Sequence, residues 1–176
     1  MNAVIGHFKT ILTHKAWVFH YAIKCGIPWR GFWHDMSKFS PIEFFESVKF
    51  YQGGKSSPIP KAKEVQGYSE AWQHHKGHNP HHYEYWVDKL DQGGVPIVMP
   101  FKYAVEMLCD YLAAGRTYHG AGFTFDDEYN WWLMKRGNIA MHQKTQNFVT
   151  EVLHELSLGH DVLNYNVLKY FYSKNC

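Results

Sequence analysis

Apolar residues recur at every third or fourth position along most of this chain, and this spacing constrains the fold more than any other feature. The clearest case is the stretch 3–24, which Gly26 and Pro28 then end. The same spacing predicts helices over 27–39, 41–52, 60–75, 80–90, 101–114, 126–135, 143–158 and 161–172. The alternation typical of strands is nearly absent. We therefore predict an all-α fold, a compact bundle of roughly seven to nine helices.

The chain of 176 residues is long enough for one domain with a substantial core. Hydrophobic residues make up 45% and aromatic residues 18%, which excludes a disordered protein. The 18 basic and 16 acidic residues are scattered, so no basic stripe indicates a nucleic-acid polymer as partner. We predict a single domain over 1–176, with the site within 14–110 and helices over 125–172 completing the bundle.

Cysteine usage and the lengths of the apolar runs indicate the compartment. Cys25, Cys109 and Cys176 are far apart and odd in number, which fits reduced thiols better than a disulfide framework. Charged residues or histidines interrupt each apolar run before it reaches membrane-spanning length. We expect a cytoplasmic protein without a membrane segment.

Histidine and aspartate stand side by side at His34-Asp35, and Lys38 follows three residues after the aspartate. An imidazole and a carboxylate together suit a divalent metal, and the carboxylate can also bridge to a second ion. On a helix the two side chains point about a quarter to a third of a turn apart, which suits a bridging carboxylate. The alternative is that Asp35 only caps the chain or pairs with Lys38.

A second aspartate, Asp110, lies inside the strongly apolar stretch 101–114. If it is buried there, it must be paired, hydrogen-bonded or metal-bound, because burying a bare carboxylate is too costly. Glu106 is one turn earlier on the same face, where it can support Asp110 or bind a basic residue. His14 lies midway along the first helix, from which a side chain can reach inward between helices. We predict that His14 and Asp110 lie near the His34-Asp35 pair.

Five of the thirteen histidines lie between positions 74 and 82, around a break at Pro80. Ligands that flank a tight break can converge on one point, and Glu84 can orient an imidazole from behind. A solvated polar loop explains one or two histidines but not five. We expect two or three of them to bind metal, and favour His74, His75 and His82 while leaving His78 and His81 as alternatives.

The order of these residues resembles the HD-domain superfamily of metal-dependent phosphohydrolases, over the range from His14 to Asp110. The run His34-Asp35-Met36-Ser37-Lys38 and the pair His74-His75 are similar to the cyclic-dinucleotide phosphodiesterase branch. The glycine-tyrosine-proline element of that branch is missing, so its substrate is not carried over. The runs 34–41 and 74–86 also resemble a family of small uncharacterised HD-like proteins of bacteria and phages, which has no established activity.

The superfamily resemblance implies an HD-like bundle in which four residues hold a first metal: His14, His34, Asp35 and Asp110. Asp35 would bridge to any second metal, whose other ligands would come from His74, His75, His81 or His82. Such sites suit iron, manganese, zinc, nickel or cobalt. Two-metal members usually have a further histidine before the His-His pair, whereas residues 36–73 contain none. Either His81 or His82 takes that role, or the site holds one ion.

The function implied is metal-dependent hydrolysis of a phosphoester, in a nucleotide or another small phosphorylated molecule, by metal-activated water. Asp35 and Lys38 are the predicted catalytic residues, with Lys38 contacting phosphate. Two other classes stay open: a non-catalytic metal- or nucleotide-binding module, and a di-iron oxygenase. The aromatic segments 129–132 and 165–172 can pack the core, line a base-stacking pocket or form the face of a homodimer.

Overall fold

The computed structural model describes residues 2–175, and helices dominate them. The prediction of an all-α fold is confirmed. The nine α-helices within this range are α1 (Ala3–Lys24), α2 (Pro28–Trp33), α3 (Pro41–Lys49), α4 (Pro58–Gln66), α5 (Glu70–His78), α6 (Phe101–His119), α7 (Phe125–Arg136), α8 (Gln143–Ser157) and α9 (Tyr165–Lys174). The short elements are the 3-10 helices η1 (Met36–Phe39), η2 (Tyr83–Trp86), η3 (Leu90–Gln92) and η4 (Gly120–Gly122), and the strands β1 (Val87–Asp88) and β2 (Val95–Pro96).

Serine caps set the starts of three helices near the site. Ser40 accepts a hydrogen bond from the backbone N–H of Glu43, with proline in the first turn, as predicted. Ser57 caps α4 in the same way, and Ser69 caps α5. The single helix predicted over 60–75 is therefore wrong, because Gly67, with φ of 80°, ends α4 and Ser69 starts a new helix.

The helix predicted over 27–39 is also interrupted, at the His-Asp pair itself. His34 is extended (φ −54°, ψ 133°), and Asp35 adopts the left-handed region with φ of 54°. The Lys15 ammonium donates to the carbonyls of Phe32 and His34, which therefore do not need helical partners. The pair lies on a sharp turn between α2 and η1, not on a helix.

No α-helix begins at Pro80, and the helix predicted over 80–90 is wrong. The chain forms η2 and a small antiparallel ribbon in which Val87 pairs with Pro96 and Asp88 with Val95. Gly93 and Gly94 have positive φ, which allows the chain to reverse between the two strands. The indole of Trp86 donates to the carbonyl of Pro80 at 2.6 Å, which fixes the turn that follows the histidine cluster.

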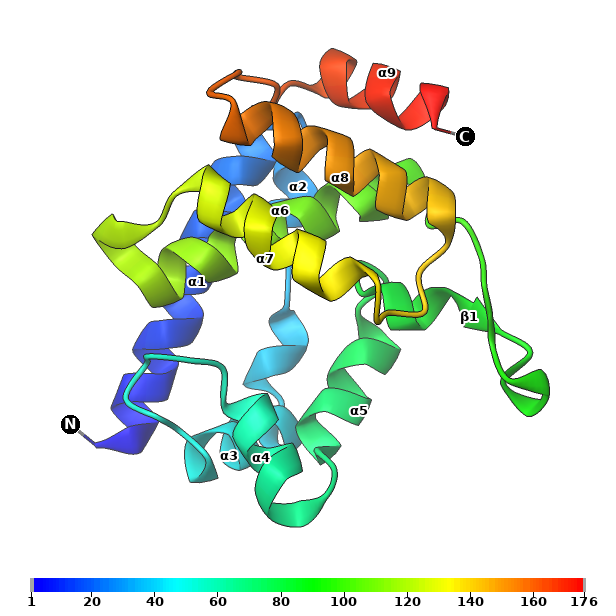
Figure 1. Ribbon diagram of the computed structural model, residues 1–176. Coiled ribbons are helices and arrows are strands. Elements are labelled where there is room, and N and C mark those ends of the chain that lie inside the picture. Colours follow the sequence, from blue (N-terminus) through cyan, green and yellow to red (C-terminus); the bar gives the residue numbers. More distant parts are fainter. Residues whose placement is uncertain (1, 176) are drawn as a thin grey trace.

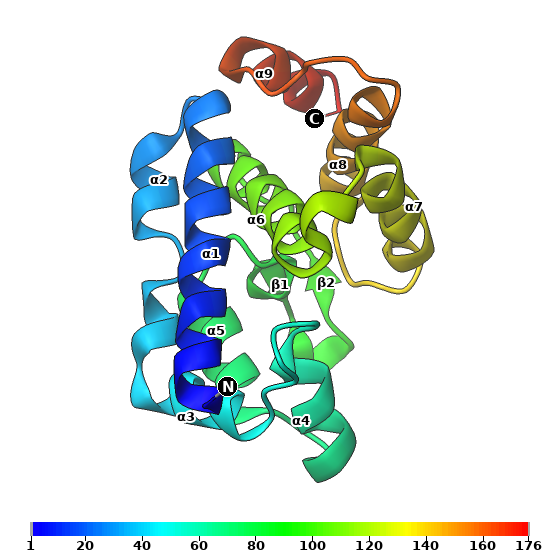
Figure 2. The ribbon, with the colours of Figure 1, turned by 90° about the vertical axis from the view of Figure 1, so that its left-hand side faces the viewer.

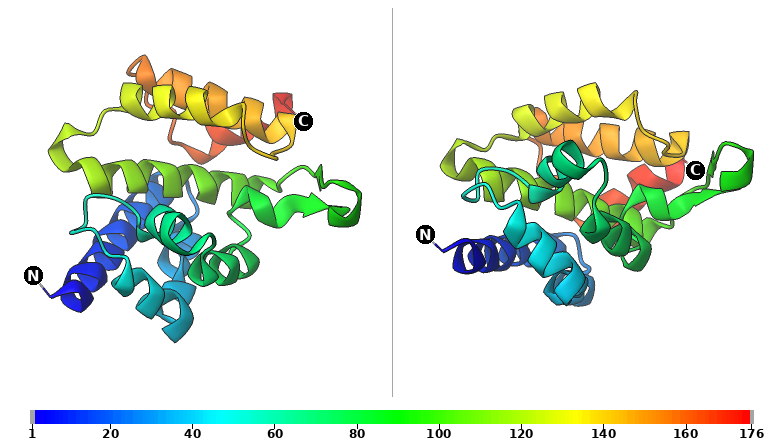
Figure 3. Two further views of the ribbon diagram at one scale, coloured as in Figure 1. Left: turned by 60° about the horizontal axis from the view of Figure 1, so that its bottom comes forward. Right: turned by 90° about the horizontal axis from the view of Figure 1, so that it is seen from below.

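Helix α6 lies at the centre of the molecule (Figure 1). Figure 3 shows it passing between α7 and α8 on one side and the helices from α1 to α5 on the other. The core is continuous across these layers, and its fully buried members include Val18 and Ala22 of α1, Leu108 and Leu112 of α6, and Phe148 of α8. Within the described residues, no helix is both long and apolar enough to cross a membrane. The residues predicted to bind metal lie between α1, α5 and α6.

Candidate metal centre

Asp35 is the residue around which the site is organised. Its side chain is 1% exposed, and its backbone has the left-handed conformation that non-glycine residues rarely adopt. Aspartate tolerates this region better than most residues, and such strain persists where surrounding contacts hold it. The turn directs the two carboxylate oxygens of Asp35 toward two different groups of histidines.

The first cluster consists of His14, His34, Asp35 and Asp110. The Nε2 atom of His34 lies 3.2 Å from Asp35 Oδ2 and 3.5 Å from Asp110 Oδ1. The Nε2 atom of His14 lies 3.0 Å from Asp110 Oδ1 and 3.9 Å from Asp35 Oδ2. One ligand atom of each residue lies within 4.8 Å of all the others, so the four can surround one ion.

The second cluster consists of Asp35, His75, His81 and His82. The Oδ1 atom of Asp35 lies 3.3 Å from the Nε2 atoms of both His75 and His81. The ligand atoms again lie within 4.8 Å of one another. Asp35 is the residue that the two clusters share, with one oxygen near each.

Most of the ligand atoms are buried and make no hydrogen bond, although Asp35 Oδ2 forms an ion pair with Lys38. The set comprises Nε2 of His14, His34, His81 and His82 and both carboxylate oxygens of Asp35. An unsatisfied buried polar group costs about 1–3 kcal/mol, and native proteins leave few of them. Coordination of a metal ion satisfies such atoms, so these groups can hold a metal ion.

Two glutamates lie behind the histidines and fix their rings. Glu106 accepts from Nδ1 of His34 at 3.1 Å, lies 3.4 Å from Nδ1 of His81, and is held by Arg30 at 2.6 Å. Glu43 accepts from Nδ1 of His75 at 2.7 Å. A proton on Nδ1 leaves Nε2 free as a metal ligand. Of the two roles considered for Glu106, binding a basic residue is confirmed, through Arg30.

Burial and neighbouring charges set the protonation states of the clusters. Burial lowers the pKa of His14 to about 4, and burial together with His81 lowers that of His82 well below its usual value. Burial alone would raise the pKa of Asp35, but His34 and Lys38 outweigh it and hold that pKa well below its usual value. Burial would also raise the pKa of Asp110, but His14 and His34 outweigh it and hold that pKa well below its usual value. Neutral imidazoles and ionised carboxylates are the forms that bind metals.

His34 and His81 respond to the negative charge of the buried carboxylates around them. Burial lowers the pKa of His34, but Asp35 and Asp110 outweigh it and raise that pKa well above its usual value. The pKa of His81 is also raised, because Asp35 and Glu106 outweigh burial and the charge of His34. His34 and His81 in turn outweigh the burial of Glu106 and lower its pKa to about 2. A divalent cation would balance these carboxylates.

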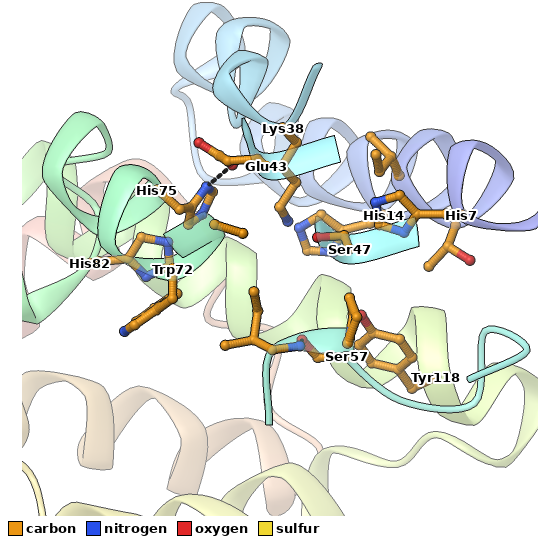
Figure 4. Close-up of a pocket in the computed structure, with 15 residues that line it drawn as sticks. His7, His14, Lys38, Glu43, Ser47, Ser57, Trp72, His75, His82 and Tyr118 are labelled. Carbon is orange, nitrogen blue, oxygen red and sulfur yellow. Dashed lines mark hydrogen bonds and ion pairs between the residues drawn. The ribbon is translucent and has the colours of Figure 1, made fainter. Parts of the chain in front are cut away.

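Lys38 lies on η1 with its ammonium 2.6 Å from Asp35 Oδ2. Burial lowers its pKa, but Asp35 and Asp110 outweigh this and raise it, so the side chain is cationic. The ion pair between Asp35 and Lys38, considered above as the alternative to a metal site, is therefore present, and Asp35 contacts the histidines as well. Figure 4 shows Lys38 at a cavity between His14 on one side and His75 with His82 on the other.

Three cavities adjoin the clusters. One, of about 350 Å³, is lined by Trp33, Asp35 and His81. The other two lie on the side of Lys38 and Asp110. The smaller, of about 120 Å³, is lined by His14, Lys38, His75 and His82. The larger, of about 700 Å³, is lined by Asp110 and by aromatic side chains of α5, α6 and α7, among them Trp72, Tyr111 and Trp131. Ser57, Ile59, Trp72, His82 and Tyr118 line both, so the cavities share a wall beside the ligands.

Six of the seven residues predicted as metal ligands lie in the two clusters: His14, His34, Asp35, His75, His82 and Asp110. The structure does not bring His74 into either cluster, because its Nδ1 bonds Glu43 at 2.6 Å and its ring stacks on His78. His81, which was left as an alternative, occupies a place in the second cluster. The sequence reasoning missed Glu43, since an acidic residue in a first helical turn is ordinary.

Comparison with known proteins places the chain in one family. Residues 3–155 match a family described as a family of unknown function (DUF5662), and the chain belongs to it. No curated protein and no solved structure matches the chain.

Proposed function

We propose that this protein is a metal-dependent phosphohydrolase that acts on a small phosphorylated molecule. The observation that carries the proposal is the convergence of four buried imidazole nitrogens, none with a hydrogen bond, on the carboxylate of Asp35, next to a cavity lined by Lys38. Imidazole and carboxylate donors suit iron, manganese, zinc, nickel or cobalt, and two clusters that share one carboxylate suit two ions. His82 and His81 then supply what the missing histidine between residues 36 and 73 would have supplied.

Divalent ions held there would lower the pKa of a water, neutralise phosphoryl charge and hold the attacking and leaving oxygens. The protein's own contribution begins with Asp35. One of its oxygens lies near each cluster, so it fixes the position of the two clusters relative to each other. Glu106 and Glu43 hold the Nδ1 protons of His34 and His75 and so aim their Nε2 atoms at the same region. The ligand geometry is therefore preorganised by groups that do not need to move.

Lys38 is the residue proposed to contact phosphate. Its ammonium lies beside Asp35 and lines the smaller cavity, so a phosphoryl group there would meet a fixed positive charge. A cation in a buried site stabilises negative charge that develops in the transition state more strongly than one in water. Lys38 would act directly on the phosphoryl oxygens, while Asp35 holds the two clusters together.

The two cavities on the side of Lys38 and Asp110 suggest how a substrate fits. The smaller one, at about 120 Å³, accommodates a phosphoryl group beside Lys38. The larger one, at about 700 Å³, is within the range of small-molecule sites and is walled by Trp72, Tyr111 and Trp131. Aromatic walls of this kind bind planar rings by stacking. We therefore favour a nucleotide, with its base in the larger cavity and its phosphate in the smaller one.

The test is hydrolysis by the purified protein after reconstitution with each of the five metals. A phosphomonoester, a phosphodiester and a panel of nucleotides serve as substrates, and Asp35→Asn is compared with Asp91→Asn, an exposed aspartate outside both cavities. We expect turnover that Asp35→Asn abolishes and Asp91→Asn preserves. Tight metal binding without turnover on any substrate would instead support a non-catalytic binding module. Dioxygen consumption with iron alone would support an oxygenase.

A further inference from the structure

Helix α1 is apolar on two sides, and only one of them faces the core. Ile11, Val18 and Ala22 are buried against the rest of the molecule. A second stripe, at spacings of three, four and seven residues, remains 39–54% exposed: Ile5, Phe8, Leu12, Phe19 and Ile23. This spacing is the seam by which one helix packs on another. The described residues supply no helix that covers it.

The exposed stripe continues onto the neighbouring elements. Phe19 contacts Phe32 of α2 at a ring distance of 6.5 Å, and Phe8 contacts Phe39 of η1 at 6.1 Å. Two tryptophans of α2 extend it further, Trp29 at 76% and Trp33 at 62% exposure. Figure 2 shows α2 alongside α1, with the chain descending past η1 to α3 on the same side. We call these residues, the α1 stripe with Trp29, Phe32, Trp33 and Phe39, the outer face.

The outer face is larger than monomeric proteins usually expose. An aromatic side chain has about 150–250 Å² of surface, so six of them and three aliphatic side chains at these exposures present on the order of 800 Å². The largest apolar patch on a typical monomer is about 300–600 Å². A standard interface covers about 800 Å² on each partner. The area thus matches one side of a stable dimer.

Charge distinguishes a protein partner from an anionic membrane. A membrane-binding face needs basic side chains at its rim. Three of the basic residues of this region are directed inward: Lys15 donates to backbone carbonyls, Arg30 to Glu106 and Lys38 to Asp35. Lys24 projects from another side of α1, while Lys9, four residues after Ile5 and three before Leu12, lies at the edge of the stripe. The outer face is therefore an apolar surface with few free cations around it.

We infer that the outer face is the contact between two copies of this chain. A two-fold axis across α1 would pair Leu12 and Phe19 of one copy with the same stripe of the other, and such isologous contacts are the commonest in oligomers. The cavity beside Lys38 stays accessible, because His14 projects from the opposite side of α1 into it. Trp29 and Trp33 also line a second approach to Asp35 and His81, which the contact would border. The inference is independent of the proposed function.

Sedimentation velocity and light scattering on the full chain at tens of micromolar test this surface. We expect twice the chain mass for the wild type and the single chain mass for Leu12→Glu with Phe19→Glu. The matched control is Thr13→Glu with His20→Glu, at exposed positions elsewhere on α1, which should remain dimeric. Circular dichroism checks that each variant is folded. If the first variant unfolds, Trp29→Ser with Trp33→Ser decides instead.

Three results would overturn the inference. The first is a monomeric wild type over the whole concentration range. The second is a dimer that withstands both outer-face variants. The third is a monomer that co-sediments with vesicles of phosphatidylcholine and phosphatidylglycerol and loses this binding on Leu12→Glu with Phe19→Glu, which would make the face a membrane contact.

Discussion

The two clusters share Asp35 but differ in charge and in origin. The first cluster has two carboxylates and two imidazoles, drawn from α1, the turn after α2, and α6. The second has three imidazoles from the stretch 75–82, and its one carboxylate is the shared Asp35. Carboxylates contribute full negative charge and imidazoles do not. We therefore expect the first cluster to bind its ion more tightly and the second to depend on Asp35.

Removal of a ligand that belongs to one cluster only has the largest expected effect, because it tests whether the two clusters bind their ions separately. Asp110→Asn should lose the tighter ion, and turnover should fall by about 10²–10³-fold or more. His82→Gln should lose the weaker ion and keep the first. Equilibrium dialysis followed by metal analysis measures both stoichiometries. If the two variants lose the same ions, the clusters are not separate sites.

The two glutamates behind the histidines also distinguish the clusters, because they contact different ligands. Glu106 contacts a ligand of each cluster, His34 and His81, whereas Glu43 contacts only His75 of the second. Substitution of such a partner usually costs about 10–100-fold in metal affinity. Glu106→Gln should therefore weaken both ions and Glu43→Gln only one, as measured by competition with a chelator. Glu64→Gln, at an exposed position of α4, is the control and should leave both affinities unchanged.

Lys38 separates metal binding from catalysis. Lys38→Met removes the cation beside Asp35 but no ligand, so the metal content should be kept. Turnover should fall by about 10²-fold, because loss of one charge-stabilising group costs about this much. Steady-state kinetics and metal analysis on one preparation measure both. Loss of the metal in this variant would mean that Lys38 holds the site together instead of acting on phosphate.

Glu128 is a buried carboxylate outside both clusters, with no close partner among the described residues to stabilise its charge. Burial raises its pKa to about 8, although Lys135 opposes this. The folded state thus holds a proton that the unfolded state releases, so its contribution to stability is full below the ordinary pKa near 4.5 and is lost as pH rises to 8. Glu128→Gln should reduce the loss of stability between pH 5 and 9 by roughly 2–4 kcal/mol, since one pKa unit is worth about 1.4. Urea denaturation at both pH values measures this, and an identical pH dependence would contradict it.

The first cluster was predictable from the sequence and the second only in part. Two of its members can be recognised from the sequence alone: Asp110 within an apolar helix and His14 midway along another. Helical spacing determines which way these side chains face. His81 depends instead on the backbone around Pro80, which forms a turn and a 3-10 helix in place of the predicted α-helix. Helical spacing therefore assigns the wrong face there. His74 lies on α5 beside His75 but contacts Glu43 and His78 instead.

The backbone at Asp35 was also beyond sequence reasoning. Its left-handed conformation depends on contacts from Lys15 and Lys38, one of them on a distant helix. The outer face escaped prediction for another reason: the stripe on α1 gives the same periodic signal whether it packs in the core or against a second copy. Local pattern determined the helices, while the turns and free surfaces depended on tertiary contacts.

The most direct test of the account is the metal content of the wild type and of Asp35→Asn after identical reconstitution and removal of free metal. We expect two ions per chain in the wild type and loss of both in Asp35→Asn, with circular dichroism showing that the variant is folded. A wild type that binds no metal, or a variant that binds as much as the wild type, would contradict this account.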